Sequence, residues 1–140
     1  MKKILLALMA LTMVSMGFSS CDNDGPSADP TTQPIAGKTY RETTTEDSYA
    51  QLTFHTNYRC TLVAKQEGQA AKTNSNFEWY MAPNDTEVTI RFAQGAYDTE
   101  TGEMLSGKTF LEGTYDAKTK TVSLTGGFRG EKMNYNMKEL

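Results

Sequence analysis

The sequence predicts an all-β protein whose folded part is an eight-stranded antiparallel up-and-down barrel, with a two-sheet β-sandwich as the alternative. From Gly37 onward, apolar residues recur at every second position, which is the period of a strand rather than of a helix. Threonine, aromatic and β-branched residues fill these runs, and such residues favour strands. The turns between the runs also assign the apolar residues to one common face. Eight consecutive antiparallel strands most simply close into a barrel.

The chain begins with a segment that is typical of an export signal. Lys2 and Lys3 precede an apolar run from Ile4 to Met16. These 13 residues are too few to span a bilayer, which takes about 20 residues. Small residues follow the run, as they do in secretory signals. We therefore predict that residues 1–20 are a signal peptide.

The residues around Cys21 suggest how the mature protein is held. Phe18-Ser19-Ser20-Cys21 resembles the lipobox of bacterial lipoproteins, in which the cysteine becomes the acylated first residue. Asp22-Asn23-Asp24 resembles the surface-export signal of Bacteroidetes-type lipoproteins. These resemblances imply lipid attachment (a palmitate-type acyl chain) at Cys21 and a cell-envelope protein anchored to the outer membrane, on its periplasmic or surface face. The alternative is an ordinary secreted protein in which Cys21 is a spare thiol.

Residues 21–36 are interpreted as the lipidated cysteine followed by a disordered tether. Three of the four prolines lie there, at Pro26, Pro30 and Pro34, among glycine, serine and threonine. Such a composition buries too little apolar surface to fold. The barrel domain is therefore expected to cover residues 37–140.

Charge and cysteine content limit the possible partners and the means of stabilisation. Without residues 1–20 the chain keeps 12 basic and 17 acidic side chains, a net charge of −5. This acidity argues against a nucleic-acid partner, because phosphate binding needs a basic face. Cys60 is the only cysteine besides Cys21, so an internal disulfide is excluded if Cys21 is acylated. The fold must then depend on its apolar core.

The first three strands follow from alternation and one turn. Residues 40–44 form the first strand, and the next two alternate around a hairpin that places Leu52 opposite Leu62. That pairing requires an odd number of residues in the loop around residues 55–57. Asn57 can adopt the left-handed conformation that such a loop needs.

The next hairpin is predicted from a turn dipeptide. Asn84-Asp85 is a favoured two-residue turn between apolar runs. Paired residues of an antiparallel hairpin share a face. The turn therefore pairs Trp79 with Ile90 and Phe77 with Phe92.

An internal similarity predicts the following pairings. The segment 97–104 resembles 115–122, and each begins with Tyr-Asp, continues with a four-residue loop and ends in a returning strand. Continuing the first register pairs Ile90 with Leu111. The second register pairs Tyr115 with Val122 and Gly113 with Leu124. Both turns therefore assign Leu111, Gly113 and Tyr115 to the apolar face.

The last strand is predicted over residues 128–138, and its alternation contains a conflict. Phe128 has an even residue number, whereas Met133, Tyr135 and Met137 have odd ones. In one regular strand, residues of even and odd number lie on opposite faces. A bulge near Gly130 would reconcile the two.

No arrangement of residues predicts catalysis, a cofactor or a metal site. His55 and Cys60 are expected on opposite faces, with His55 toward solvent and Cys60 buried. The oxygen-rich segment 98–103 could suggest calcium, but it lacks the spacing of a helix-loop-helix calcium site, and its similarity to 115–122 favours a turn. We therefore expect that the protein is not an enzyme.

The inner face offers a candidate ligand pocket. Core packing is the simpler interpretation of its large side chains, but Ala50, Ala64 and Gly113 on the same face would leave room for a ligand. The candidate pocket residues are Phe77, Trp79, Ile90, Phe92 and Leu111.

The layout of residues 37–140 resembles the lipocalin-like small lipoproteins. The resemblance rests on the opening Gly37-Lys38-Thr39-Tyr40, on Trp79 in a middle strand and on the turn Gly113-Thr114-Tyr115-Asp116. It implies a barrel that binds a small apolar molecule. The alternative function is a protein–protein interaction module or inhibitor that presents its loops to another envelope protein.

Overall fold

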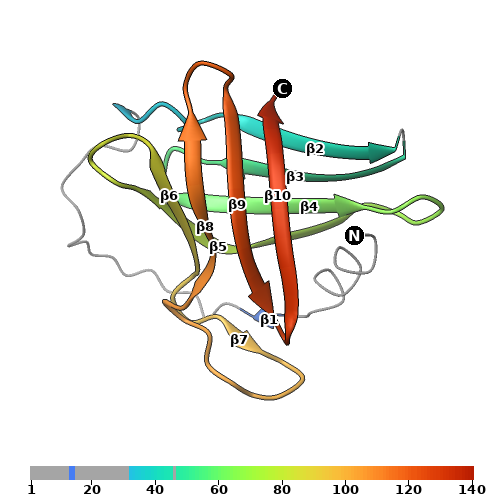
Figure 1. Cartoon of the computed structure of the whole chain (residues 1–140). Coiled ribbons are helices and arrows are strands. Elements are labelled where there is room, and N and C mark those ends of the chain that lie inside the picture. Colours follow the sequence, from blue (N-terminus) through green and yellow to red (C-terminus); the bar gives the residue numbers. More distant parts are fainter. Residues whose placement is uncertain (1–12, 15–31, 46) are drawn as a thin grey trace.

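The computed structural model describes residues 13–14, 32–45 and 47–140, and these residues confirm the predicted barrel. Eight antiparallel strands close in the order β10-β2-β3-β4-β5-β6-β8-β9, and β1 pairs with β7 in a separate two-stranded sheet (Figure 1). The strands are β1 (Met13–Val14), β2 (Thr39–Thr45), β3 (Ser48–Phe54), β4 (Arg59–Lys65), β5 (Lys72–Met81), β6 (Glu87–Phe92), β7 (Tyr97–Asp98), β8 (Thr109–Asp116), β9 (Thr121–Phe128) and β10 (Glu131–Glu139).

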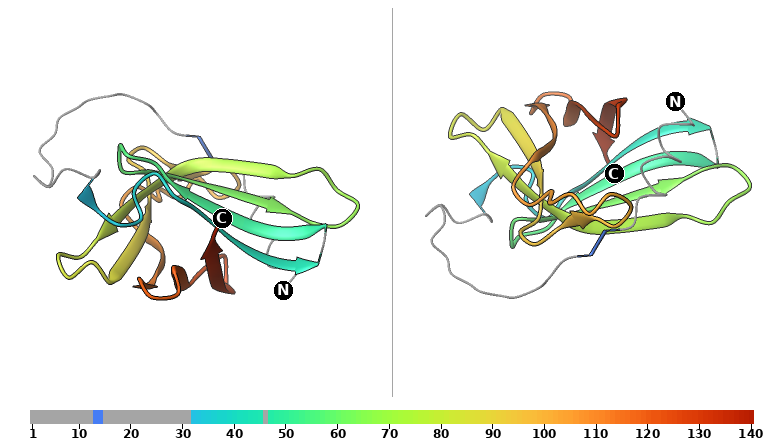
Figure 2. Two further views of the ribbon diagram at one scale, coloured as in Figure 1. Left: turned by 90° about the horizontal axis from the view of Figure 1, so that it is seen from above. Right: turned by 90° about the horizontal axis from the view of Figure 1, so that it is seen from below.

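The barrel consists of two groups of strands that cross each other. One group contains β2 to β5, the other contains β5, β6, β8, β9 and β10, and both include β5. Strand β5 pairs with β4 from Lys72 onward but with β6 only from Phe77 onward. Figure 2 shows that β2, β3 and β4 extend to one side, well beyond β10. The two groups therefore diverge on that side, where β2 and β10 have to meet to close the barrel.

The registers predicted from the turns are confirmed. Leu52 pairs with Leu62, Trp79 with Ile90, Phe77 with Phe92, Ile90 with Leu111, Gly113 with Leu124, and Tyr115 with Val122. Each pair lies on the buried face, apart from the half-buried Gly113. Alternation and turn length were therefore sufficient to assign these strands.

Two turns differ in detail from the prediction. In the β3–β4 hairpin Tyr58, and not Asn57, has a positive φ of 69°. The Asn57 side chain instead accepts a hydrogen bond from the Arg59 amide at 3.1 Å, so it stabilises the turn through a local contact. The β5–β6 connection is longer than Asn84-Asp85 alone, since β5 ends at Met81 and β6 begins at Glu87, and within it the Asp85 amide donates to the Ala82 carbonyl.

The internal similarity corresponds to two related turns. Asp98 accepts a hydrogen bond from the Glu100 amide at 2.8 Å, and Asp116 accepts one from the Lys118 amide at 2.9 Å. Each loop ends in a left-handed residue, Gly102 or Lys120. The register between β6 and β8 shifts after Ile90, however, so the predicted pairing does not continue unbroken to the turn. The 93–108 loop, which contains β7, connects these two strands.

The prediction for the last strand was wrong. Phe128 ends β9 and does not begin the last strand, and the chain reverses through Arg129-Gly130 before β10. Both turn residues have positive φ, 56° and 80°, which matches the twist of a two-residue hairpin. The change of parity between Phe128 and Met133 thus comes from a turn between two strands, and no bulge is needed.

The folded part begins before Gly37. Ile35, which was assigned to the tether, is fully buried in the core, and the Lys38 amide donates to its carbonyl. Gly37 has a φ of 76° and donates to the Phe54 carbonyl, so the entering chain is bound to β3. Residues 33–37 therefore cover one end of the barrel core.

A charge pair attaches the 93–108 loop to the β9–β10 turn. Asp98 is 2% exposed, and its carboxylate accepts hydrogen bonds from the Arg129 guanidinium at 2.5 and 3.1 Å. The hydrogen bond from Arg129 is the main cause that lowers the pKa of Asp98, against the opposing effect of burial. Glu100 lies 3.1 Å from the same guanidinium.

Replacing Asp98 with asparagine is expected to lower the free energy of unfolding at pH 7 by roughly 2 kcal/mol, because Arg129 loses the nearer and buried one of its two charged acceptors and keeps only the exposed Glu100. The native pKa of Asp98 is lowered, so its contribution is fully present above the ordinary aspartate pKa of about 4. The contribution is lost as the pH falls through the native pKa. Urea unfolding at pH 7, 5 and 3 should show the difference between the two proteins shrinking below pH 4.

Asp116→Asn is the matched control, since Asp116 stabilises the related turn through the amides of Lys118 and Thr119 and pairs with no arginine in the described residues. A loss equal to that of Asp98→Asn would mean that the turn, and not the charge pair, carries the effect.

Candidate functional site

The five predicted pocket residues all lie inside the barrel. Their side chains are at most 2% exposed and come from three neighbouring strands, β5, β6 and β8. The residues are Phe77, Trp79, Ile90, Phe92 and Leu111.

Aromatic rings fill the space around the phenylalanines of this set. The Phe77 ring stacks on Phe110 with centroids 4.7 Å apart, and Phe92 contacts both rings. Phe92 also contacts Phe128 at 5.5 Å. Phe110 was not assigned to the inner face, because its parity is opposite to that of Leu111. The register shift between β6 and β8 lets both side chains be buried.

Trp79 lies near the end of the barrel formed by the β3–β4 hairpin. Its ring contacts those of Phe54 and Tyr58, with ring centroids 5.7 and 5.2 Å apart. Its indole nitrogen Nε1 donates a hydrogen bond to the His55 carbonyl at 2.9 Å. Trp79 thus joins the core to the hairpin loop.

Gly113 does not leave space for a ligand, contrary to the expectation. A Cβ placed on Gly113 would lie 1.8 Å from the carbonyl oxygen of Ser123. The missing side chain therefore lets β8 and β9 approach closely. Of the three small residues expected to leave room, Ala50 and Ala64 remain, and they pair with each other on β3 and β4.

A pair of tyrosines brings polar groups into the interior beside the β2–β10 junction. Tyr135 is 4% exposed, and its hydroxyl makes no hydrogen bond with any residue that the structure describes. The Tyr40 hydroxyl is also buried and has no hydrogen bond of normal geometry within the described part of the chain, although Tyr115 lies close enough to affect it. Leaving a buried hydroxyl unsatisfied costs about 1–3 kcal/mol. The Tyr135 hydroxyl is therefore available to a polar atom in the interior.

Burial dominates the electrostatics of both tyrosines. It raises the pKa of Tyr135, and the Glu42 carboxylate raises it further. Burial also raises the pKa of Tyr40, with smaller effects from Tyr115 and Glu139. Both hydroxyls therefore stay protonated near neutral pH and can each donate one hydrogen bond.

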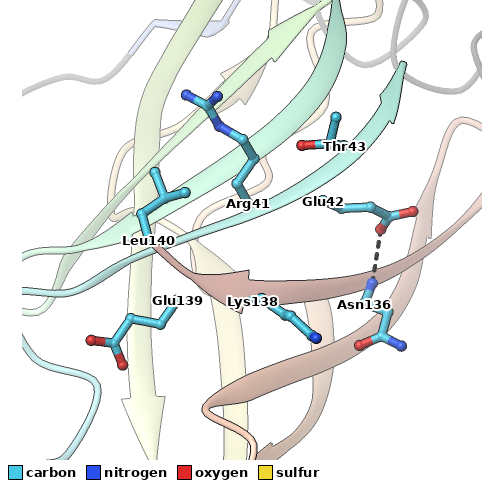
Figure 3. A pocket seen from close by; sticks show the side chains of 7 residues that line it. All are labelled: Arg41, Glu42, Thr43, Asn136, Lys138, Glu139 and Leu140. Carbon is cyan, nitrogen blue, oxygen red and sulfur yellow. Dashed lines mark hydrogen bonds between the residues drawn. The ribbon is translucent and has the colours of Figure 1, made fainter. Parts of the chain in front are cut away.

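The junction between β2 and β10 is open over most of its length. The two strands pair only at Lys138 with Arg41 and at Glu139 with Tyr40. Beyond these pairs, a carboxylate oxygen of Glu42 accepts a hydrogen bond from the Asn136 amide at 2.8 Å (Figure 3). A pocket of about 410 Å³ lies here, lined by Arg41, Glu42, Thr43, Asn136, Lys138, Glu139 and Leu140.

His55 and Cys60 do not form a catalytic pair. Cys60 is fully buried on the inner face, and burial raises the pKa of its thiol, so the thiol stays protonated. His55 is half-buried, and its Nε2 lies 2.8 Å from the Thr61 hydroxyl. Among the described residues, no group of three histidine, cysteine or acidic side chains could hold a metal ion.

The predicted lipid attachment residue, Cys21, lies outside the described residues, as does most of the predicted tether. Within the part of the chain that the structure describes, no helix is long and apolar enough to cross a membrane.

Comparison of the chain with protein families, with curated proteins and with solved structures finds no match.

Proposed function

We propose that this protein is a lipoprotein of the cell envelope, anchored through an acyl chain on Cys21, that binds a small ligand inside its barrel. The ligand has an apolar body and at least one hydrogen-bonding group. The body lies against the apolar inner face, and its polar group meets the hydroxyl of Tyr135.

The observation that carries this proposal is the buried Tyr135 hydroxyl without a hydrogen-bond partner among the described residues. Buried polar side chains in folded proteins almost always have a partner. The Tyr40 hydroxyl on the same inner face is also buried and makes no hydrogen bond of normal geometry with any described residue, but Tyr115 lies close to it. A ligand with an acceptor atom would satisfy Tyr135 and would lose this interaction wherever the hydroxyl is removed.

The opening between β2 and β10 supports a route to this place. Tyr135 belongs to the part of β10 that has no strand partner in β2, and the carboxylate of Glu42, close enough to raise the Tyr135 pKa, lies at the opening. A ligand that enters here would pass between β2 and β10, which pair at only two positions. The end near Trp79 is less suitable, because rings and the 33–37 segment occupy it.

The test is to purify the full-length protein from the membrane fraction of a bacterial host under mild conditions and to measure bound small molecules by native mass spectrometry. The wild-type protein is expected to retain a small molecule that Tyr135→Phe retains at least tenfold less, as for a lost hydrogen bond of about 1.4 kcal/mol. The substitution removes one oxygen atom and keeps the ring, so the shape of the interior is unchanged.

Tyr97→Phe is the matched control, because Tyr97 lies on β7, outside the barrel sheet. It should retain the ligand as the wild-type protein does. Equal retention by Tyr135→Phe and the wild-type protein, or no small molecule on either, would contradict the proposal.

A further inference from the structure

The outer edge of β10 is a second feature of the β2–β10 junction, and it does not depend on the ligand. Every other pair of neighbouring barrel strands is matched at five or more positions, and β10 is matched with β9 at eight. On its other side, β10 is matched with β2 at two positions. Most of β10 therefore has a strand neighbour on one side only.

The backbone groups of alternate β10 residues point toward this edge. The Leu140 amide donates to Thr39 of β2, and the Asn136 amide donates to Glu42. The register between β10 and β9 is uniform from Glu131 to Lys138, so Asn134 has the same orientation as Asn136. Lys132 follows the same alternation. Neither residue has a backbone partner in β2.

The contact between Glu42 and Asn136 shows what this edge can bind. A carboxylate oxygen of Glu42 lies 2.8 Å from the Asn136 amide, where the carbonyl oxygen of a neighbouring strand would otherwise accept the hydrogen bond. The edge thus binds an acceptor from a side chain at one position. At Asn134 and Lys132 no described strand supplies one.

The side chains around the edge indicate what kind of strand would fit. Lys132 and Lys138 lie on the exposed face of β10, whereas the Arg41 guanidinium on β2 donates to Gln51 and lies over Tyr49. Met133 and Tyr135 lie on the buried face. An added strand would therefore meet the positive charge of Lys132 and Lys138 on its outer face and apolar side chains on its inner face, and it would end where the Glu42 carboxylate already binds the Asn136 amide.

We propose that the edge of β10 from Lys132 to Asn136 binds an extended segment of another polypeptide, which adds to the sheet as a strand. The segment carries acidic side chains at alternate positions, facing Lys132 and Lys138, and apolar side chains between them. The backbone amides and carbonyls of Asn134 and Lys132 supply the hydrogen bonds, as in other cases of strand addition to a sheet edge.

The experiment measures binding of a short capped peptide of alternating glutamate and valine to the full-length protein in detergent, by isothermal titration calorimetry. Asn134→Pro removes the edge amide without removing a hydrogen bond to β9, and an edge strand tolerates proline. Asn134→Val changes the side chain at the same position and keeps the amide. We expect Asn134→Pro to weaken peptide binding about tenfold or more, and Asn134→Val to bind as the wild-type protein does.

A peptide with lysine in place of glutamate should bind more weakly than the glutamate peptide. The proposal is overturned if the glutamate peptide fails to bind, or if Asn134→Pro binds it as well as the wild-type protein. A concentration-dependent dimer that is lost in Asn134→Pro would also overturn it, because the edge would then belong to a second copy of this chain. The ligand proposal stands or falls separately, since Asn134→Pro leaves the Tyr135 hydroxyl in place.

Discussion

Replacing Gly113 with alanine is expected to lower the free energy of unfolding by about 3 kcal/mol or more, the upper end of the range for overpacking. The new Cβ would lie 1.8 Å from the Ser123 carbonyl oxygen and 2.9 Å from the Leu124 Cα. Both are backbone atoms, so no side chain can turn away to make room. Strands β8 and β9 would have to separate, which would weaken the ladder on both sides of Gly113.

Urea unfolding followed by tryptophan fluorescence measures this loss. Glu112→Ala is the control, because Glu112 is the exposed neighbour on the same strand and should change the stability by less than about 0.5 kcal/mol. If Gly113→Ala were as stable as Glu112→Ala, β8 and β9 could not approach as closely as described.

Replacing Trp79 with alanine is expected to cost about 3–5 kcal/mol, the range for truncating a buried aromatic side chain. The change removes the contacts with Phe54 and Tyr58 and also the hydrogen bond from the indole nitrogen to the His55 carbonyl, which keeps only the longer bond from the Tyr58 amide at 3.2 Å. Trp79→Phe keeps a ring but loses the hydrogen bond, so a smaller loss of about 1–2 kcal/mol is expected.

Both variants lack the only tryptophan of the chain, so their stability is measured by circular dichroism during urea unfolding. Lys72→Ala is the control on the same strand, since Lys72 is exposed. Equal stability of Trp79→Ala and Lys72→Ala would be incompatible with Trp79 as a core residue.

Much of the fold could be predicted because strand pairing obeys a parity rule. A turn of known length assigns each residue its partner, and the pairs of Trp79 with Ile90 and Leu52 with Leu62 followed directly. The rule fails where a residue is inserted or a turn is mistaken for strand. Phe128 was placed in the wrong strand for this reason, since Arg129 in a left-handed conformation has no strong sequence signal.

The candidate site was less accessible to sequence reasoning. Alternation shows which face a side chain occupies, but not which side chains from across the barrel fill the space beside it. The contact of Phe77 with Phe110 and the close approach of β9 to Gly113 both depend on such distant neighbours. The parity of Tyr135 was recognised, yet whether its hydroxyl has a hydrogen-bond partner among the described residues depends on every group around it.

The central claim is that the Tyr135 hydroxyl serves a ligand and not the fold, and the stability of ligand-free Tyr135→Phe tests it most directly. The proteins are unfolded, separated from small molecules, refolded and compared by urea unfolding. We predict that the variant is as stable as the wild-type protein or more stable, because removing a buried hydroxyl without a partner removes an unfavourable burial. A loss of more than about 1 kcal/mol would contradict the claim, since the hydroxyl would then have a structural partner.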